Sequence, residues 1–508
     1  MKHKSVLSGI SILLILTFVL SCGDQAVNEG IGVFREAPCP FDLPEGLVLG
    51  ENFKFGYVTV PEFHKQPNGK TIEVAVAIFP STSDNPGPPL VLNTGGPGES
   101  NMDNFIPPLA IKHSGRLGEL VLPHRDAVII ELRGLRYARP NLISEELIKA
   151  RYDMLDQNLN YDEMLAIQAK ALEETRDRFE KEGINLSAFN NVETAADIAM
   201  IMTNLGYEKF SMFGSSAGTV LAQHVIRDYP EMVSCAVLNA GVPIGTHISQ
   251  MVPDAVSSLK RIFDKCEEDL DCSEAFPDLE HRFLHFLDSI NTHPITIPVD
   301  VPGKDEQLNY VLNGHRFAGM IMLYSYFSPQ VPLLIEQIMS GDYSFVNQYV
   351  GFQSFMSTFA DILGYSVFLS EYPVFNQSDI IIDPAYTTFA NGVTAIGLGG
   401  HYLLSVDTIF NIPKLDPKII EPQGSSDVPL LVLNGVYDPV VPEYLDEIFK
   451  NRFKNCYLYR FDGVAHSPVD FAEECAIAMF FEFIDDPSKA PESACLDEYH
   501  LNLEIKGN

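Results

Sequence analysis

A serine flanked by small residues stands where an apolar stretch gives way to a helix-like pattern. The segment Gly214-Ser215-Ser216-Ala217-Gly218 fits the spacing G-x-S-x-G, in which a tight strand-to-helix turn holds the serine and only small neighbours leave room for that turn. KFSMF before it predicts a strand, and TVLAQHVIRDYP after it predicts a helix whose N-terminus favours negative charge. The alternative is that small residues merely soften the turn. In this context we expect the turn to present the Ser216 hydroxyl as a nucleophile.

A serine hydroxyl needs a base to take its proton, and candidates follow in the chain order Ser, Asp, His. Asp438 comes directly after the apolar run PLLVLNGVY, and His466 follows the next predicted strand in FDGVAHSP. We expect Asp438 to orient the imidazole of His466, which acts first as a base and then as an acid. Asp462 and Asp470, on the histidine's own loop, are the alternative orienting acids.

The negative charge that develops on an attacked carbonyl oxygen needs two backbone N–H donors. Ala217, directly after the serine, is expected to supply one of them. The second is expected from the glycine-rich segment NTGGPG at 93–98, where Gly95 is the first candidate and Gly96 the fallback. A simple Gly-Pro turn is the alternative, but the position after the apolar run PLVL favours the oxyanion site.

Apolar runs predict the sheet that would position these groups. The runs 56–62 and 71–79 are typical of an antiparallel pair, and the continuous apolar runs within 88–100 and 126–134 suit strands buried on both faces. A helical period with a closing glycine spans 191–206. Strands alternating with helices predict an α/β fold with a mostly parallel central sheet and helices on both faces.

The pattern changes after residue 245. From 246 to 408 the apolar residues recur at helical spacing, which predicts an inserted, mainly helical cap. The sheet pattern then resumes, so the core would have a first part, 39–245, and a second part, 409–508, with a C-terminal tail.

The N-terminus predicts export and anchoring. Residues 1–21 have a basic start and a short apolar run, which is typical of a secretory signal and too short for a membrane crossing. VLSC at its end is similar to a bacterial lipobox, so we expect lipidation of Cys22 and a tether over 22–38. An ordinary signal peptide with a stray cysteine is the alternative. The expected location is extracytoplasmic, on a bacterial membrane, either periplasmic or at the cell surface.

Export also affects how the cysteines are interpreted, because an oxidising compartment permits disulfides. Cys266 with Cys272 can close a small loop, and Cys475 with Cys495 can pin the C-terminal tail. Cys235, in an apolar run, is expected to be a buried free thiol.

Charge and motif content exclude several classes of partner. The chain of 508 residues has 68 acidic and 34 basic side chains, a formal charge of −34, which excludes nucleic-acid binding. His281 and His285 are four residues apart, but no glutamate follows the first histidine, and the cysteine spacings do not fit zinc. No phosphate-binding loop or dinucleotide fingerprint is present. We therefore expect no metal and no cofactor.

Together these motifs resemble a known family, the α/β-hydrolase serine exopeptidases that include prolyl and tripeptidyl aminopeptidases. The resembling segments are NTGGPGES, ELRGLRYARPNL, NVETAADIAMIMTNLGYEKFSMFGSSAGT, CEEDLDC, SVFLSEYPVF, NGVYDPVVP and GVAHSPVDFAEEC. The resemblance implies an α/β-hydrolase fold, removal of residues from free peptide N-termini, and a cap that recognises the amino group. It offers Glu371, in FLSEYPVF, as the partner of that group. Ala217, where the family usually has a bulky aromatic, and Glu131, where it usually has Asp, leave substrate preference open.

The residues and the resemblance predict a serine hydrolase that works through an acyl-enzyme, with short peptides as substrates. An esterase or amidase of the same fold is the first alternative, because the same three groups hydrolyse esters and a fold does not fix a substrate. A non-catalytic surface binding lipoprotein is the second, although decayed folds usually lose one of the three residues. The oligomeric state is not predicted.

Overall fold

A mixed sheet forms the centre of the protein. The structure is a computed structural model that describes residues 30–110, 116–246, 250–301, 307–372, 381–396, 400–421 and 424–506. Within these residues, nine strands pair in the order β1-β2-β3-β5-β4-β6-β7-β10-β11. Their bounds are β1 Phe34–Glu36, β2 Lys54–Pro61, β3 Thr71–Phe79, β4 Gly87–Asn93, β5 Arg125–Ile130, β6 Phe210–Ser215, β7 Val233–Asn239, β10 Leu430–Gly435 and β11 Cys456–Phe461.

The directions of the strands confirm the predicted α/β class. β1, β2, β3 and β5 pair antiparallel in that order, which includes the predicted antiparallel pair β2–β3. From β5 onward every neighbouring pair is parallel. The carboxyl ends of the parallel strands therefore share one edge of the sheet, where the loops of a catalytic site can meet.

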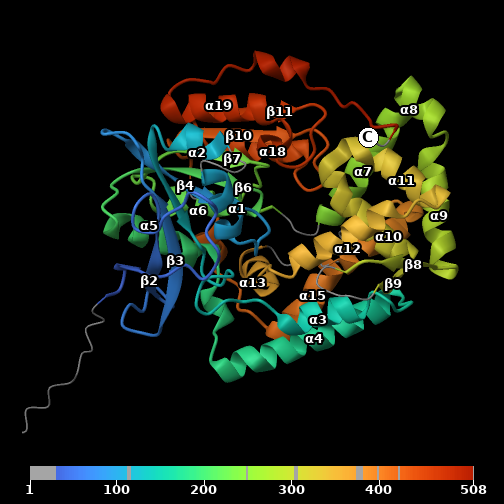
Figure 1. Ribbon diagram of the computed structural model, residues 1–508, viewed down its shortest axis with the longest axis horizontal. Coiled ribbons are helices and arrows are strands. Elements are labelled where there is room, and N and C mark those ends of the chain that lie inside the picture. Colours follow the sequence, from blue (N-terminus) through green and yellow to red (C-terminus); the bar gives the residue numbers. More distant parts are fainter. Residues whose placement is uncertain are drawn as a thin grey trace, which may run out of the picture.

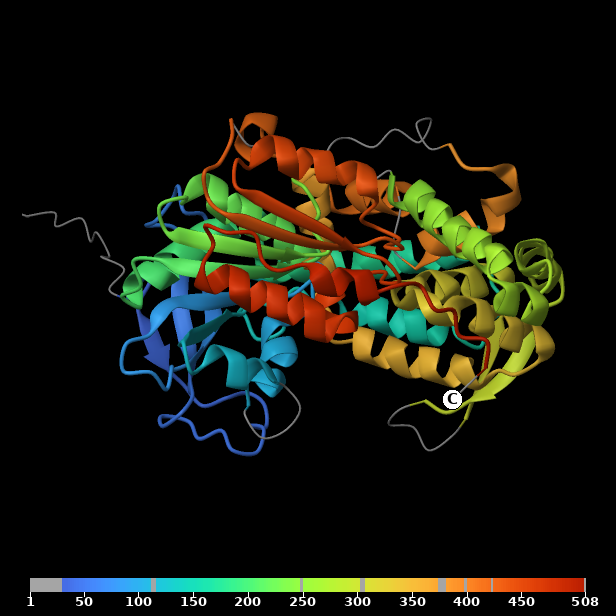
Figure 2. The same cartoon turned by 90° about the horizontal axis from the view of Figure 1, so that it is seen from above.

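Helices cover both faces of this sheet, as Figures 1 and 2 show. In β4, Val91 packs into the core of one face, while Leu90 and Leu92 pack into the core of the other, as the period of two in a strand requires. The first face is covered by α5 Asn191–Asn204, α6 Ala217–Asp228 and α17 Asp446–Arg452. The second is covered by α1 Asn101–Leu109, α2 Arg116–Val121 and α19 Glu473–Asp485.

A mainly helical lobe lies beside the sheet and has a hydrophobic cluster of its own (Figure 1). It contains α7 Met251–Glu268, α8 Leu270–Ala275, α9 Leu279–Thr292, α10 Gly314–Tyr324, α11 Val331–Ser340, α12 Ser344–Met356, α13 Asp361–Glu371, α14 Thr387–Ala395 and α15 Gly400–Phe410. The buried apolar residues of α13 and α15 belong to the cluster on the first face of the sheet instead. A small antiparallel hairpin, β8 Ile295–Val299 with β9 Leu308–Leu312, is also part of the lobe. The short helices α16 Pro417–Ile420 and α18 Pro468–Phe471 follow later in the chain.

A helical excursion of the chain after β5 contacts the cap. Helices α3 Glu145–Asp153 and α4 Tyr161–Glu182 leave the sheet after β5, and α4 packs against α14 and α15. The Asn313 side chain donates a hydrogen bond to the carbonyl of Leu159, and Gln168 donates one to the carbonyl of Ala395. The buried residues Ala171, Leu172 and Phe179 of α4 nevertheless belong to the hydrophobic cluster of the sheet, so α4 contacts both lobes, and the assignment of 39–245 to the core stays a prediction.

The N-terminal boundary also differs from the prediction. Phe34 pairs with Val58, so the sheet begins inside the segment 22–38 that was expected to be only a tether. The predicted signal segment 1–21 and the predicted lipidation site Cys22 lie outside the described residues. Among the residues that are described, we find no helix with the length and apolarity needed to cross a membrane.

Two disulfides close the loops that the cysteine spacing suggested. Cys266 bonds to Cys272, and Cys475 bonds to Cys495, which ties α19 to the C-terminal segment. Cys235 is a buried free thiol, as expected, and burial raises its pKa to about 11.

Candidate active site

The turn between β6 and α6 holds Ser216 in an unusual backbone conformation. Its φ of 51° and ψ of −118° lie in a region that residues other than glycine rarely occupy. A Cβ on Gly214 would lie 2.5 Å from the carbonyl oxygen of Gly218, and one on Gly218 would lie 2.4 Å from that of Thr94. Larger residues at positions 214 and 218 would clash with the backbone, which explains the two glycines of the G-x-S-x-G spacing. Ser216 lies between the end of β6 and the N-terminus of α6.

Asp438 and His466 come together as the chain order predicted. The Nδ1 atom of His466 lies 2.7 Å from Oδ2 of Asp438, and both side chains are buried. The other carboxylate oxygen, Oδ1, accepts hydrogen bonds from the backbone N–H groups of Val440 and Val441, at 2.8 and 2.9 Å. These contacts fix the carboxylate, which in turn fixes the ring and leaves its Nε2 atom for other partners.

The alternative acids on the histidine loop do not take this position. Asp462 is exposed and lies 3.3 Å from His500, on the outside of the fold. Asp470 is solvent-accessible at the same cavity as His466, with no hydrogen bond between the two side chains. The ring of Tyr326, from the cap, packs edge-on against His466 with 4.8 Å between ring centroids. His466 is thus held by a core carboxylate on one side and a cap aromatic on another.

The loop after β4 approaches the serine closely. A Cβ on Gly95 would lie 2.9 Å from Cβ of Ser216, so only glycine allows this approach. Gly96 has a φ of +110°, and a Cβ on it would point toward the backbone of Glu99 rather than toward Ser216. The contact with Ser216 favours Gly95 over Gly96 as the residue beside the reacting carbonyl, next to Ala217 at the start of α6.

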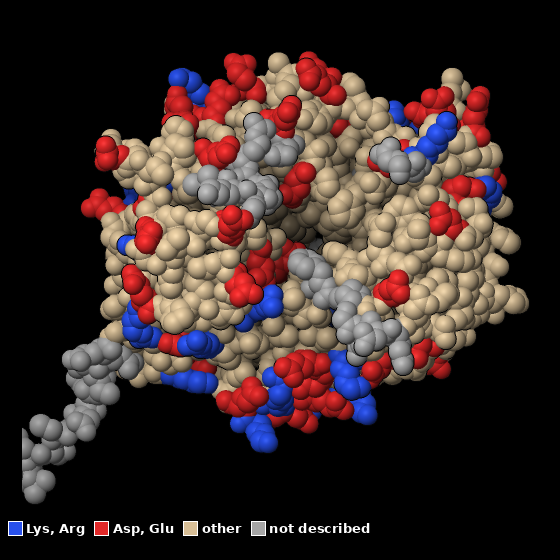
Figure 3. Space-filling view, viewed as in Figure 1, with Lys and Arg blue, Asp and Glu red and all other residues tan. Residues whose placement is uncertain are grey.

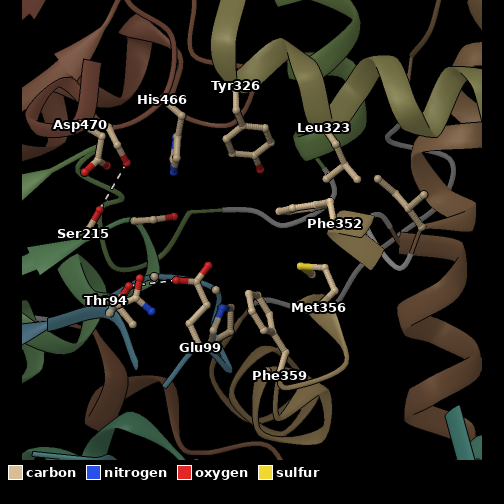
Figure 4. Close-up of a pocket in the computed structure, with 18 of the residues that line it drawn as sticks. Thr94, Glu99, Ser215, Leu323, Tyr326, Phe352, Met356, Phe359, His466 and Asp470 are labelled. Carbon is tan, nitrogen blue, oxygen red and sulfur yellow. Dashed lines mark hydrogen bonds between the residues drawn. The ribbon is translucent and has the colours of Figure 1, made fainter. Parts of the chain in front are cut away.

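A cavity of about 800 Å³ joins these groups. Core loops contribute Gly95, Ser216 and His466 to its wall, and the cap contributes a largely apolar wall that includes Leu323, Tyr326, Phe352, Met356 and Phe359 (Figure 4). The space-filling view shows the surface hollowed between the two lobes (Figure 3). The arrangement can hold a small, partly apolar substrate with one bond against Ser216.

The prediction for Glu371 was wrong. Its side chain is only 3% exposed and does not line the cavity. Its carboxylate accepts hydrogen bonds from the backbone N–H and the side-chain amide of Asn191, at 2.5 and 3.0 Å, and lies 3.3 Å from Nε2 of His224. Glu371 therefore fastens the end of α13 to the start of α5 and to α6, which is a structural role.

Two acids that line the cavity were not assigned a binding role from the sequence. Glu99 ends the glycine-rich loop, and Asp470 follows His466 by four residues. Their positions in the sequence could have indicated a role, because Glu99 follows the predicted oxyanion loop and Asp470 follows the predicted catalytic histidine. Within the described residues, no group of three or more His, Cys, Asp or Glu side chains could hold a metal ion.

Comparison with known proteins agrees with this architecture. The family model described as the alpha/beta hydrolase fold matches residues 88–273, a range that contains Gly95 and Ser216. The fold is the α/β-hydrolase fold. Among solved structures, an alpha/beta hydrolase fold protein from Chitinophaga pinensis aligns with 82% of this chain and 94% of its own, at 14% identity and a TM-score of 0.34.

Two curated proteins are distant relatives of the chain. Serine protease Hip1 of Mycobacterium tuberculosis is 28% identical over 210 residues, which are 40% of this chain and 39% of the relative. Tripeptidyl aminopeptidase of Streptomyces lividans is 28% identical over 257 residues, 50% of this chain and 43% of the relative. The chain thus matches about two fifths of the length of these relatives.

Proposed function

We propose that the protein is a serine hydrolase that removes residues from the free N-termini of short peptides. The observation that carries the proposal is the Asp438–His466 hydrogen bond at the wall of the cavity that also contains Ser216. The distant relatives named serine protease and tripeptidyl aminopeptidase support a peptide as the substrate. The cap over the cavity supports a small substrate, because a folded chain would not enter.

The proposed reaction runs through an acyl-enzyme. The Ser216 oxygen attacks the carbonyl carbon of the scissile amide while Nε2 of His466 takes the hydroxyl proton, and Asp438 stabilises the resulting imidazolium. The backbone N–H groups of Gly95 and Ala217 stabilise the negative oxygen of the tetrahedral intermediate. The C–N bond then breaks, the leaving amine receives the proton from His466, and a water molecule activated by His466 releases the acyl group.

The first test compares three kinds of substrate with the wild-type protein. We expect release of p-nitroaniline from aminoacyl- or tripeptidyl-p-nitroanilides and at least about tenfold slower release once their amino groups are acetylated. Equal rates for the free and acetylated amides would contradict the exopeptidase proposal. Hydrolysis of p-nitrophenyl butyrate without any amide cleavage would favour the esterase alternative, and no hydrolysis at all would favour the binding lipoprotein.

The close approach of Gly95 to Ser216 gives a further prediction. Gly95→Ala should lower kcat about 100- to 1,000-fold, the usual effect of losing an oxyanion donor, because the new Cβ would displace the loop from Ser216. Gly87→Ala is the matched control, since a Cβ there would meet its nearest atom at 3.7 Å. Both variants should keep the Tm of the wild type. An unchanged kcat for Gly95→Ala would remove this loop from the mechanism.

We also propose that Cys22 carries a lipid that anchors the protein to a bacterial membrane. The two disulfides support an oxidising, extracytoplasmic location. In cells fed with labelled palmitate, the wild type should take up label and Cys22→Ala should not. Absence of label from both proteins would contradict the anchor.

A further inference from the structure

Three carboxylates line the cavity that contains Ser216, and they differ in their partners. Asp361 is paired with Arg151, whose Nη1 atom lies 2.9 Å from its carboxylate. Glu99 accepts a hydrogen bond of 2.9 Å from the Thr94 hydroxyl, which is neutral. Within the described part of the chain, no Lys or Arg side chain lies within ion-pair distance of Glu99 or Asp470. Among the described residues, these two acids therefore differ from Asp361 in having no arginine or lysine as a direct ion-pair partner.

The surroundings of both acids make that charge costly. Desolvation by burial raises the pKa of Glu99, and the nearby charge of Asp470 raises it further, while Thr94 and His466 act in the opposite direction. Desolvation also raises the pKa of Asp470, opposed by His466 and Ser467. A partly desolvated carboxylate gains from a cation that a ligand brings with it, because the ion pair offsets the lost hydration.

Glu99 follows Gly95 by four residues in the same loop. It belongs to the same loop as Gly95, which touches Ser216, and its Cγ atom lies 3.5 Å from where a Cβ on Gly96 would be. Figure 4 shows its carboxyl group directed into the cavity, on the side where Phe359 and Met356 lie. One residue of an extended peptide spans about 3.3–3.6 Å. The charge of His466 acts to lower the pKa of both Glu99 and Asp470, so both acids lie close to the reacting base, and a cation bound by them would belong to a substrate atom near the scissile bond.

We propose that Glu99, with Asp470 as a second acid, binds the α-ammonium group of the substrate and so sets cleavage after the first residue. This inference rests on the proposed function and adds the residue that recognises the free N-terminus. The cavity wall also includes the aromatic side chains Phe105, Phe213 and Phe480, which suit an apolar first side chain of the substrate. Recognition comes from loops of the core in this arrangement, and Glu371 of the cap has no part in it.

The test measures a ratio that general damage to the protein would leave unchanged. For the wild type and Glu99→Gln, kcat/KM is determined for L-phenylalanine p-nitroanilide and for its N-acetyl derivative. The ratio of the free to the acetylated substrate should fall about 10- to 100-fold in Glu99→Gln, as expected for loss of one charged hydrogen bond. Glu119→Gln, which changes an exposed carboxylate on α2 outside the cavity, should keep the wild-type ratio.

Each outcome separates this inference from the proposed function. A wild type that prefers the free amine, together with an unchanged ratio in Glu99→Gln, overturns the inference and leaves the exopeptidase standing. A wild type with no preference for the free amine, or with no amide cleavage, overturns both. Preference of the wild type for Ala-Ala-Phe p-nitroanilide over the phenylalanine compound overturns cleavage after the first residue. If Glu99→Gln does not fold, the ratio is measured in Glu99→Ala, which also removes the charge, and an unchanged ratio there overturns the inference.

Discussion

Ser216→Ala should lower kcat/KM for every hydrolysed substrate by roughly 10⁶-fold, the loss typical of removing a catalytic serine. Ser216, whose backbone has a φ of 51°, lines the cavity, and under the proposed mechanism alanine has no atom that can form the acyl bond. The fold should persist, because the hydroxyl caps no helix N–H at the start of α6. Initial rates and thermal melting check both statements.

The neighbouring serine is the matched control. Ser215 has the same side chain, but its hydroxyl is 3.3 Å from that of Ser467 and accepts a hydrogen bond of 3.2 Å from Asn239. Ser215→Ala should therefore keep most of the rate. A fluorophosphonate should add its mass to the peptide that contains Ser216 in the wild type and in Ser215→Ala, and to no peptide in Ser216→Ala. If the Ser216→Ala variant were still labelled, Ser216 would not be the nucleophile.

The sequence predicted best where local sterics and chain order decide the outcome. The turn at Ser216 requires small neighbours, and Asp438 and His466 follow strands whose ends must meet at one edge of a parallel sheet. Each of these is readable from a few adjacent residues. The positions of strands and helices in the sheet region could also be predicted, because the spacing of apolar residues along the chain is a local feature of the sequence.

The errors concern which neighbour a side chain meets across the fold. Glu371 lies in an aromatic helical segment, and the sequence does not reveal that its carboxylate turns toward Asn191 and His224 and away from the cavity. The position of α4 is a different case: it has the pattern of any surface helix, and only tertiary packing shows that it contacts α14 and α15 as well as the sheet core. Glu99 stands in a recognised motif, but only the three-dimensional structure shows that it lines the cavity and that no Lys or Arg of the described residues pairs with it.

Asp438→Asn should lower kcat roughly 10⁴-fold at neutral pH while leaving the shape of the site intact. The backbone N–H groups of Val440 and Val441 donate to Oδ1, so the asparagine would keep its carbonyl oxygen there and point its amide NH₂ at Nδ1 of His466. That NH₂ donates, which forces the imidazole to carry its own proton on Nε2. A protonated Nε2 cannot accept the proton of Ser216, so the base is lost through its tautomer and not through its position.

The control for this prediction is the exposed acid on the same loop. Asp462→Asn removes an equal charge near His466 in sequence, but the side chain of Asp462 faces His500 outside the cavity. Its kcat should stay within about twofold of the wild type, as for most surface substitutions, which cost under about 0.5 kcal/mol. A large loss in Asp462→Asn, with little loss in Asp438→Asn, would reverse the roles of the two acids. If kcat falls only in Asp438→Asn, the effect of this carboxylate depends on its contact with Nδ1 of His466. A negative charge elsewhere on the histidine loop would then not be enough.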